Sequence, residues 1–218
     1  IIDQLEPGMK IHTLKIVDHP FSTIPPELCQ LTTLTVLALE NTLLTSVPPE
    51  IGRLSRLVRL DLRDNFLHML PAEIGDLSQL EMLKLGNNNF DILPQQLWQL
   101  TELSTLTLGH NRLEHLPPQI GQLVRLKHLS LHINLLTSLP EEMEYLTGLT
   151  HLRLDHNNLT SLPHTFLQLT SLVHLRLDHN QVNYLQPALG NLVNLTELAL
   201  FSNNLQYLPA EISHLYHK

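Results

Sequence analysis

Leucine and other apolar residues recur along the chain at fixed positions. Leu149, Leu152 and Leu154 precede Asn157, and the same residue types return 23 positions earlier and 23 positions later. The frame covers 11–217 as nine repeats, which start at 11, 34, 57, 80, 103, 126, 149, 172 and 195. Each repeat approximates LxxLxLxxNxLxxLPxxIGxLxx. A fixed period of this length predicts a stacked architecture, in which neighbouring repeats bury apolar faces that one repeat cannot bury alone.

Each repeat is expected to contain one short strand and one return segment. In the xLxLx stretch apolar and polar residues alternate, so the leucines point to one side and the polar residues to the other. The proline that follows suits the start of a short helical or extended return, although repeat eight has Gln186-Pro187 instead. Trp98 and Cys29 occupy the glycine position of the IG element, and we expect them to be partly exposed on the convex side.

An asparagine follows the strand in seven of the repeats. A buried turn needs donors and acceptors for its loose backbone groups, and an amide side chain offers both. We therefore interpret these asparagines as structural, with no glycosylation or catalytic role. His19 and Thr42 replace asparagine in the first two repeats. Such departures from the consensus are expected in the terminal repeats of a repeat protein. The asparagines are Asn65, Asn88, Asn111, Asn134, Asn157, Asn180 and Asn203.

The repeat resembles that of the leucine-rich repeat family, and the resemblance covers the chain after residue 10. Its LPxxIG form, as in LPAEIGDL and LPPQIGQL, is similar to the 23-residue intracellular class. That class includes Ras-suppressor-like proteins, plant intracellular relatives and bacterial proteins, some of them effectors delivered into host cells. The resemblance implies an α/β fold: a right-handed leucine-rich-repeat solenoid curved as a horseshoe arc, with a parallel concave sheet and short helical or 3-10 segments on the convex side.

The same resemblance implies a non-catalytic module, such as a signalling scaffold, that binds a partner protein through its concave face. In some relatives such repeats precede a ubiquitin-ligase, GTPase or kinase domain, so a substrate-targeting arm of a larger enzyme is the alternative. Residues 1–10 hold no full repeat, and we expect an N-terminal cap or partial repeat there. We expect a C-terminal cap or further domain after Lys218, and a monomer unless that uncapped end self-associates.

Composition narrows the classes of partner. The formal net charge is −8 with histidine neutral, which disfavours nucleic acid as a partner. No apolar run approaches the roughly 18 residues of a membrane span, so membrane insertion is not expected. The glycines belong to the repeat and form no phosphate-binding loop, so no cofactor is expected. The single cysteine and the lack of cystine caps favour an intracellular site, in the cytoplasm or, for a secreted effector, in the host cytosol.

Charged residues and histidines gather at the solvent-facing strand positions. The string HLRLDHN occurs at 151–157 and again at 174–180. We expect its His, Arg and Asp side chains to face the concave solvent, beside the equivalent side chains of the next strand. Like charges across a strand pair are mildly destabilising, so these stripes have no evident benefit for folding. Recognition is favoured over the alternative, in which a recent duplication copied a neutral solvent face.

The predicted partner-binding residues form two groups and one apolar anchor. Phe201 is either a binding anchor or is covered by a C-terminal region. The first group is Arg59, Asp61, Arg63 and Lys84. The second group is His128, His132, His151, Arg153, Asp155, His156, His174, Arg176, Asp178 and His179.

Three other roles of this face are open but less favoured. His128, His151 and His174 could bind zinc or copper through imidazole, although parallel side chains on a flat, wet sheet do not converge. A pH switch would follow from neighbouring imidazoles that resist joint protonation, with a net direction that the sequence does not give. Catalysis by a serine, a histidine and an acid of this face lacks a pocket and an oxyanion hole.

Overall fold

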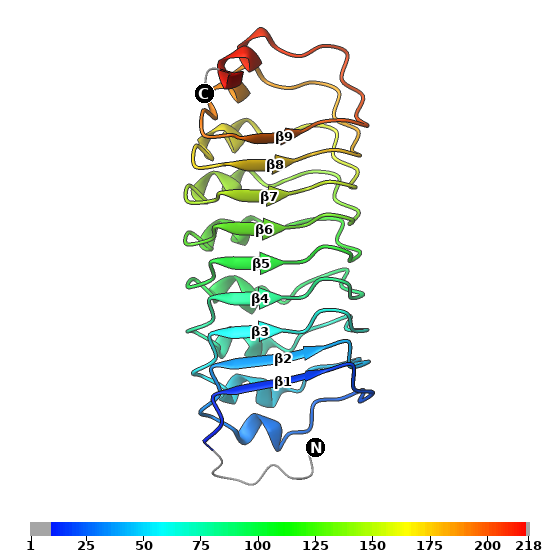
Figure 1. The fold of residues 1–218 in the computed structure, drawn as a ribbon, viewed down its shortest axis with the longest axis vertical. Helices are drawn as coiled ribbons and strands as arrows, with labels where there is room; N and C mark the ends of the chain where they lie inside the picture. The colour runs from blue at the N-terminus through cyan, green and yellow to red at the C-terminus, as the bar shows by residue number, and fades with distance from the viewer. Residues whose placement is uncertain (1–9, 217–218) are drawn as a thin grey trace. The chain divides into compact units, whose positions relative to one another are not determined.

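The computed structural model describes residues 10–216, so the cap predicted for residues 1–10 lies almost wholly outside the described residues. The chain divides into two compact units, residues 1–107 and 108–218, and each is considered by itself. In both units one short strand alternates with one 3-10 segment, and all strands of a unit point the same way (Figure 1). A strand with the return segment that follows it is called a rung below.

The described part of the first unit contains five strands and four 3-10 segments. The strands are β1 (Thr13–Val17), β2 (Val36–Glu40), β3 (Arg59–Asp61), β4 (Met82–Lys84) and β5 (Thr105–Thr107), and the 3-10 segments are η2 (Leu28–Gln30), η3 (Pro49–Arg53), η4 (Ala72–Asp76) and η5 (Gln95–Gln99).

The second unit has the same plan over the residues that the structure describes. Its strands are β6 (His128–Ser130), β7 (His151–Arg153), β8 (His174–Arg176) and β9 (Glu197–Ala199), and its 3-10 segments are η6 (Pro118–Gln122), η7 (Glu141–Tyr145), η8 (His164–Gln168), η9 (Pro187–Asn191) and η10 (Ala210–Tyr216).

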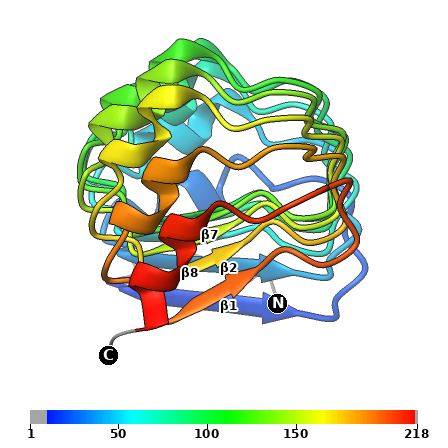
Figure 2. The ribbon, with the colours of Figure 1, turned by 90° about the horizontal axis from the view of Figure 1, so that it is seen from above.

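Leucines of the strands form the core of each unit. In the first unit the parallel register places Leu60 opposite Leu37 and Leu83, and all three are fully buried. Burying one such side chain contributes about 1.5–3 kcal/mol. The 3-10 segments lie on the side opposite the strands and close the core (Figure 2). The predicted parallel sheet with short 3-10 segments, and with it the solenoid fold, is confirmed.

The prediction for Trp98 and Cys29 was wrong, because both side chains are buried. The glycine position of the return segment faces the next rung and not the solvent. A Cβ atom on Gly75 would lie 2.9 Å from the carbonyl oxygen of Gln96 in the next return segment. Burial also raises the pKa of the Cys29 thiol to about 11, so this cysteine is an unreactive core residue.

The structural role predicted for the asparagines is confirmed. Asn88 Nδ2 donates to Leu85 O of its own rung at 3.1 Å and to Leu62 O of the preceding rung at 3.0 Å. Its Oδ1 accepts from Leu67 N, also of the preceding rung, at 3.0 Å. Each such amide therefore satisfies backbone groups of two successive rungs, which a buried turn requires.

Candidate protein-interaction surface

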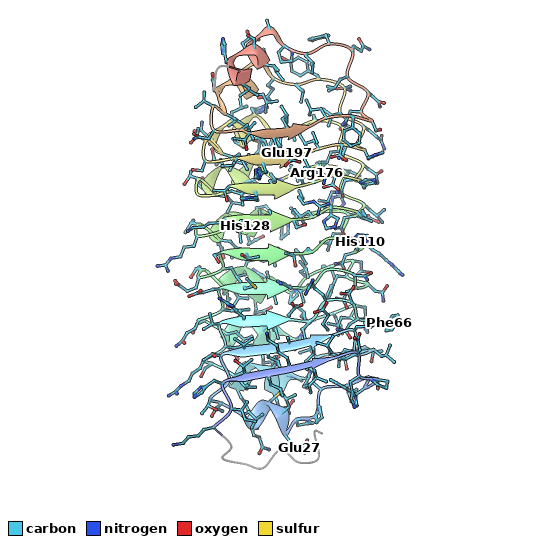
Figure 3. All side chains as sticks on the ribbon, in the orientation of Figure 1. Glu27, Phe66, His110, His128, Arg176 and Glu197 are labelled. Carbon is cyan, nitrogen blue, oxygen red and sulfur yellow. The ribbon has the colours of Figure 1, made fainter. Side chains whose placement is uncertain are left out.

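Histidine rings contact one another along the strand side of the second unit. The strand register places His151 opposite His128 and His174, and the ring centroids are 4.3 Å and 4.5 Å apart. Burial, followed by the neighbouring His128 and His174, lowers the pKa of His151 below its ordinary value. Figure 3 labels His128 and Arg176 on this side. We call the following residues the histidine face: His128, His132, His151, His156, His174 and His179.

A second row of rings follows the strand ends. His156 and His179 adopt left-handed backbone conformations, with φ of 56° and 54°, and their rings stack at 4.1 Å. The ring of Phe201 meets His179 edge-on at 5.3 Å and is 59% exposed. Three rings thus form a continuous ladder, and the described residues leave its end at Phe201 open to solvent.

Arginine and aspartate form ion pairs in the same two rungs as His156 and His179. Arg153 Nε and Nη2 donate to the two carboxylate oxygens of Asp155 at 3.2 Å and 3.1 Å. Arg176 Nε donates to Asp178 Oδ1 at 3.3 Å. Burial alone would raise the pKa of Asp155, but the hydrogen bonds and charge of Arg153 hold it below its ordinary value.

The expectation that both aspartates face the solvent was wrong. Asp155 is 2% exposed and Asp178 is fully buried. Strand β7 ends at Arg153 and strand β8 ends at Arg176, so each aspartate lies two residues beyond its strand. At that point the alternation of side chains in a strand no longer determines which way a side chain points. The guanidinium groups cover the carboxylates, so arginine and not aspartate is offered to the solvent.

His132 occupies a niche made by a glycine. A Cβ atom on Gly109 would overlap the imidazole ring of His132, so the ring lies directly over the glycine backbone. Ser130 Oγ and His132 Nδ1 are 2.7 Å apart in a hydrogen bond, and His110 meets the ring edge-on at 5.0 Å. Burial, followed by the charge of Arg153 and opposed by Asp155, lowers the pKa of His132 to about 4.

The residues predicted in the first unit form an ion network. Arg63 Nη2 is 3.1 Å from Glu40 Oε2, and Arg63 Nε is 2.9 Å from Asp61 Oδ1. Lys84 Nζ lies 3.5 Å from Asp61 Oδ2. The structure therefore brings three of the four predicted residues together, whereas Arg59 is exposed on the same strand as Asp61.

Two neighbours of the histidine face were missed by the sequence reasoning. His110 contacts His132, and Ile133 adopts a left-handed conformation with φ of 50° and is 37% exposed. Both occupy the position of His156 in earlier repeats, so the repeat frame itself was the available signal. Within the described residues, His128, His151 and His174 do not bring their ring nitrogens together as a possible metal-ligand group, whereas Asp155, His156 and Asp178 do bring their ligand atoms together.

None of the described helices has the length and apolar character needed to cross a lipid bilayer.

Residues 109–217 match the family model described as a leucine-rich repeat region. Residues 32–90 and 55–113 match a second model, described as leucine rich repeat. A comparison with curated proteins finds no match.

Solved structures with the same fold come from bacteria and plants. A leucine-rich-repeat protein of Leptospira interrogans is 32% identical, with a TM-score of 0.74 over 89% of this chain and 56% of its own. The TDR receptor is 31% identical, with a TM-score of 0.87 over 94% of this chain and 37% of its own.

The plant peptide hormone receptor RGFR1, solved in complex with RGF2, is 30% identical, with a TM-score of 0.84 over 93% of this chain and 34% of its own. The chain thus spans about half of the bacterial protein and about a third of each receptor. The repeat frame, the parallel strands and the family models agree, and the chain belongs to the leucine-rich repeat family.

Proposed function

We propose that the chain is a non-catalytic protein-binding module whose partner contacts the histidine face and Phe201. The observation that carries the proposal is the exposed ladder of His156, His179 and Phe201, together with the partly exposed Arg153 and Arg176 of the preceding strands. Aromatic residues such as phenylalanine, and arginine, are enriched where proteins bind proteins. A rigid aromatic ring offers a large contact area at a small loss of conformational freedom.

The chemistry of the surface supports a protein over other partners. A formal charge of −8 opposes binding to a polyanion such as nucleic acid. The arginines are held in place by their aspartates, and a charged group that is already positioned loses less entropy when a partner binds. Among the similar structures, the receptor RGFR1 is in complex with RGF2, which supports recognition of a protein or peptide by this type of scaffold.

An exposed phenylalanine in each unit makes a matched experiment possible. Phe201 is 59% exposed and Phe66, which belongs to the first unit, is 54% exposed. We would prepare the wild type, Phe201→Ser and Phe66→Ser, and verify equal folding by circular dichroism. Each would then be used for affinity capture with chemical cross-linking and mass spectrometry of the captured proteins.

The expected result is a partner that the wild type and Phe66→Ser retain and Phe201→Ser loses, with cross-links near the histidine face. Loss with Phe66→Ser alone would move the binding surface to the first unit. Equal capture by all three proteins, with cross-links elsewhere, would overturn the proposal.

The proposal keeps an intracellular working site as an expectation, including the host cytosol for a bacterial effector. Fractionation of the source cells and an immunoblot against the chain would test it. The same blot would compare the length of the native protein with 218 residues, which bears on the alternative of a targeting arm of a larger enzyme.

A further inference from the structure

We infer that Asp155, His156 and Asp178 form a site for a divalent transition-metal ion, with Zn²⁺ the best match. Each residue offers one ligand atom, and these atoms all lie within 4.8 Å of one another. The residues follow strands β7 and β8, and His156 is itself one of the three rings of the ladder. This inference does not rest on the proposed protein-binding function. Its ligands differ from His128, His151 and His174, here called the histidine column, which the sequence offered as a possible metal site.

The spacing of the first two ligands suits tetrahedral coordination. His156 Nδ1 is 3.5 Å from Asp155 Oδ2, which is longer than a good hydrogen bond between these atoms. Two ligands bound tetrahedrally at zinc distances of 2.0–2.2 Å lie about 3.4 Å apart. An ion could therefore bridge these two atoms with almost no movement of either side chain.

The third ligand has an unused oxygen. Asp178 is fully buried, and its Oδ2 has no hydrogen-bond partner, whereas its Oδ1 accepts from Arg176 Nε. Buried polar atoms nearly always have a partner, and leaving one unsatisfied costs about 1–3 kcal/mol. A bound cation would satisfy this oxygen directly.

The donor set selects the class of metal. One imidazole nitrogen and two carboxylate oxygens suit Zn²⁺ and its transition-metal neighbours, whereas Ca²⁺ takes six to eight oxygen ligands. Stacking on His179 at 4.1 Å restricts the rotation of the His156 ring. A ligand held by its surroundings loses less freedom when the metal binds.

The two arginines compete with the metal for the same carboxylates. The site is near neutral without metal, because Arg153 and Arg176 balance Asp155 and Asp178. Their side chains are 41% and 35% exposed, so each guanidinium can rotate into water when an ion arrives. Removing that competition by Arg153→Gln should tighten metal binding, which a site formed by unrelated residues would not show.

The test is calorimetric titration of Zn²⁺ into protein without a polyhistidine tag, after dialysis against EDTA. We expect one saturable site in the wild type. In His156→Asn the affinity should be at least about tenfold weaker, because loss of a ligand should cost no less than the roughly 10–100-fold loss seen for residues that only support a ligand. Asparagine tolerates the left-handed backbone of this position, so the variant should fold. Asp178→Asn should also lose binding, with circular dichroism as the check on its folding.

The matched control is His151→Asn/His174→Asn, which removes two imidazoles from the same strands and leaves all three proposed ligands. It should bind Zn²⁺ as the wild type does, and the visible spectrum of bound Co²⁺ should show the same nitrogen and oxygen ligands in both. No saturable binding in the wild type, or unchanged affinity in His156→Asn, would overturn the inference. Loss in the control alone would assign the metal to the histidine column instead.

Discussion

The acidic side chains on the strand sides of the two units differ in their burial. In the first unit Arg63 bridges Glu40 and Asp61, and all three side chains retain some contact with solvent. In the second unit Asp155 and Asp178 are buried beneath their arginines, and imidazole rings occupy the surface. The same type of rung therefore carries two kinds of surface. In the first unit the charged side chains pair with one another in contact with solvent, and in the second unit the aspartates are buried and imidazole rings are exposed.

This difference separates stabilising ion pairs from a candidate binding surface. Half-exposed pairs contribute little, because solvent screens them and two long side chains lose freedom. A buried carboxylate, in contrast, depends on its partner, because it has no water to replace a lost hydrogen bond. The contrast leads to three predictions on stability, in order of decreasing size.

The largest effect is expected from Arg176→Ala, which leaves the buried Asp178 carboxylate without its hydrogen-bond donor. Stability should fall by about 2–4 kcal/mol, whereas Arg63→Ala in the first unit should cost about 0–1 kcal/mol. Urea denaturation followed by circular dichroism measures both. The double variant Arg176→Met/Asp178→Leu should recover most of the loss, since no charge is left buried. Equal losses of stability in Arg176→Ala and Arg63→Ala would contradict the proposed difference between the two units.

An effect of intermediate size concerns His132. Its pKa is lowered from the ordinary 6.5 to about 4, so the folded protein keeps this imidazole neutral where the unfolded chain takes up a proton. Stability should therefore fall as the pH decreases from 6.5 to 4, by about 2 kcal/mol from this residue after allowance for partial solvent screening.

Denaturation of His132→Gln over the same pH range should lack that part of the slope. His164→Gln is the control, because the His164 side chain is 87% exposed. An NMR titration that gave His132 an ordinary pKa would contradict this prediction.

The smallest effect is expected at Ile133, whose φ of 50° is strained for a β-branched residue. Ile133→Asn should stabilise the protein by about 1 kcal/mol. One of the equivalent residues of the first unit, Asn87, has φ of 54° and donates to Asp64 Oδ1 at 2.6 Å. Asn87→Ile should therefore destabilise, and thermal melting of both variants compares them. Two changes of the same sign would show that backbone strain does not decide this position.

The sequence predicted those features that depend on periodicity. Strand leucines such as Leu60 and Leu83 are buried opposite each other because alternation and the 23-residue frame fix both orientation and register. The asparagine turns followed from the chemistry of the amide group. Repetition therefore specified the register of the buried leucines, and the resemblance to the leucine-rich repeat family supplied the parallel sheet.

The features that were missed depend on where a strand ends and on contacts between successive returns. Asp155 was expected in solvent because the alternation was extended past Arg153, where strand β7 ends. The burial of Trp98 reflects the spacing of return segments, which the pattern of one repeat does not contain. The unpartnered Asp178 oxygen depends on atomic positions across two rungs, and no pattern of residue types encodes it.

The asparagine ladder gives the assembly of each unit a direction. Asn157 donates to Leu131 O and accepts from Leu136 N, and both groups belong to the rung that precedes it. A rung therefore lacks part of its hydrogen bonding until the next asparagine has been added. On a ribosome the N-terminal part emerges first, so each new asparagine would complete the hydrogen bonds of the turn in the preceding rung. The rungs of the nascent chain would therefore become stable in the order in which they are synthesised.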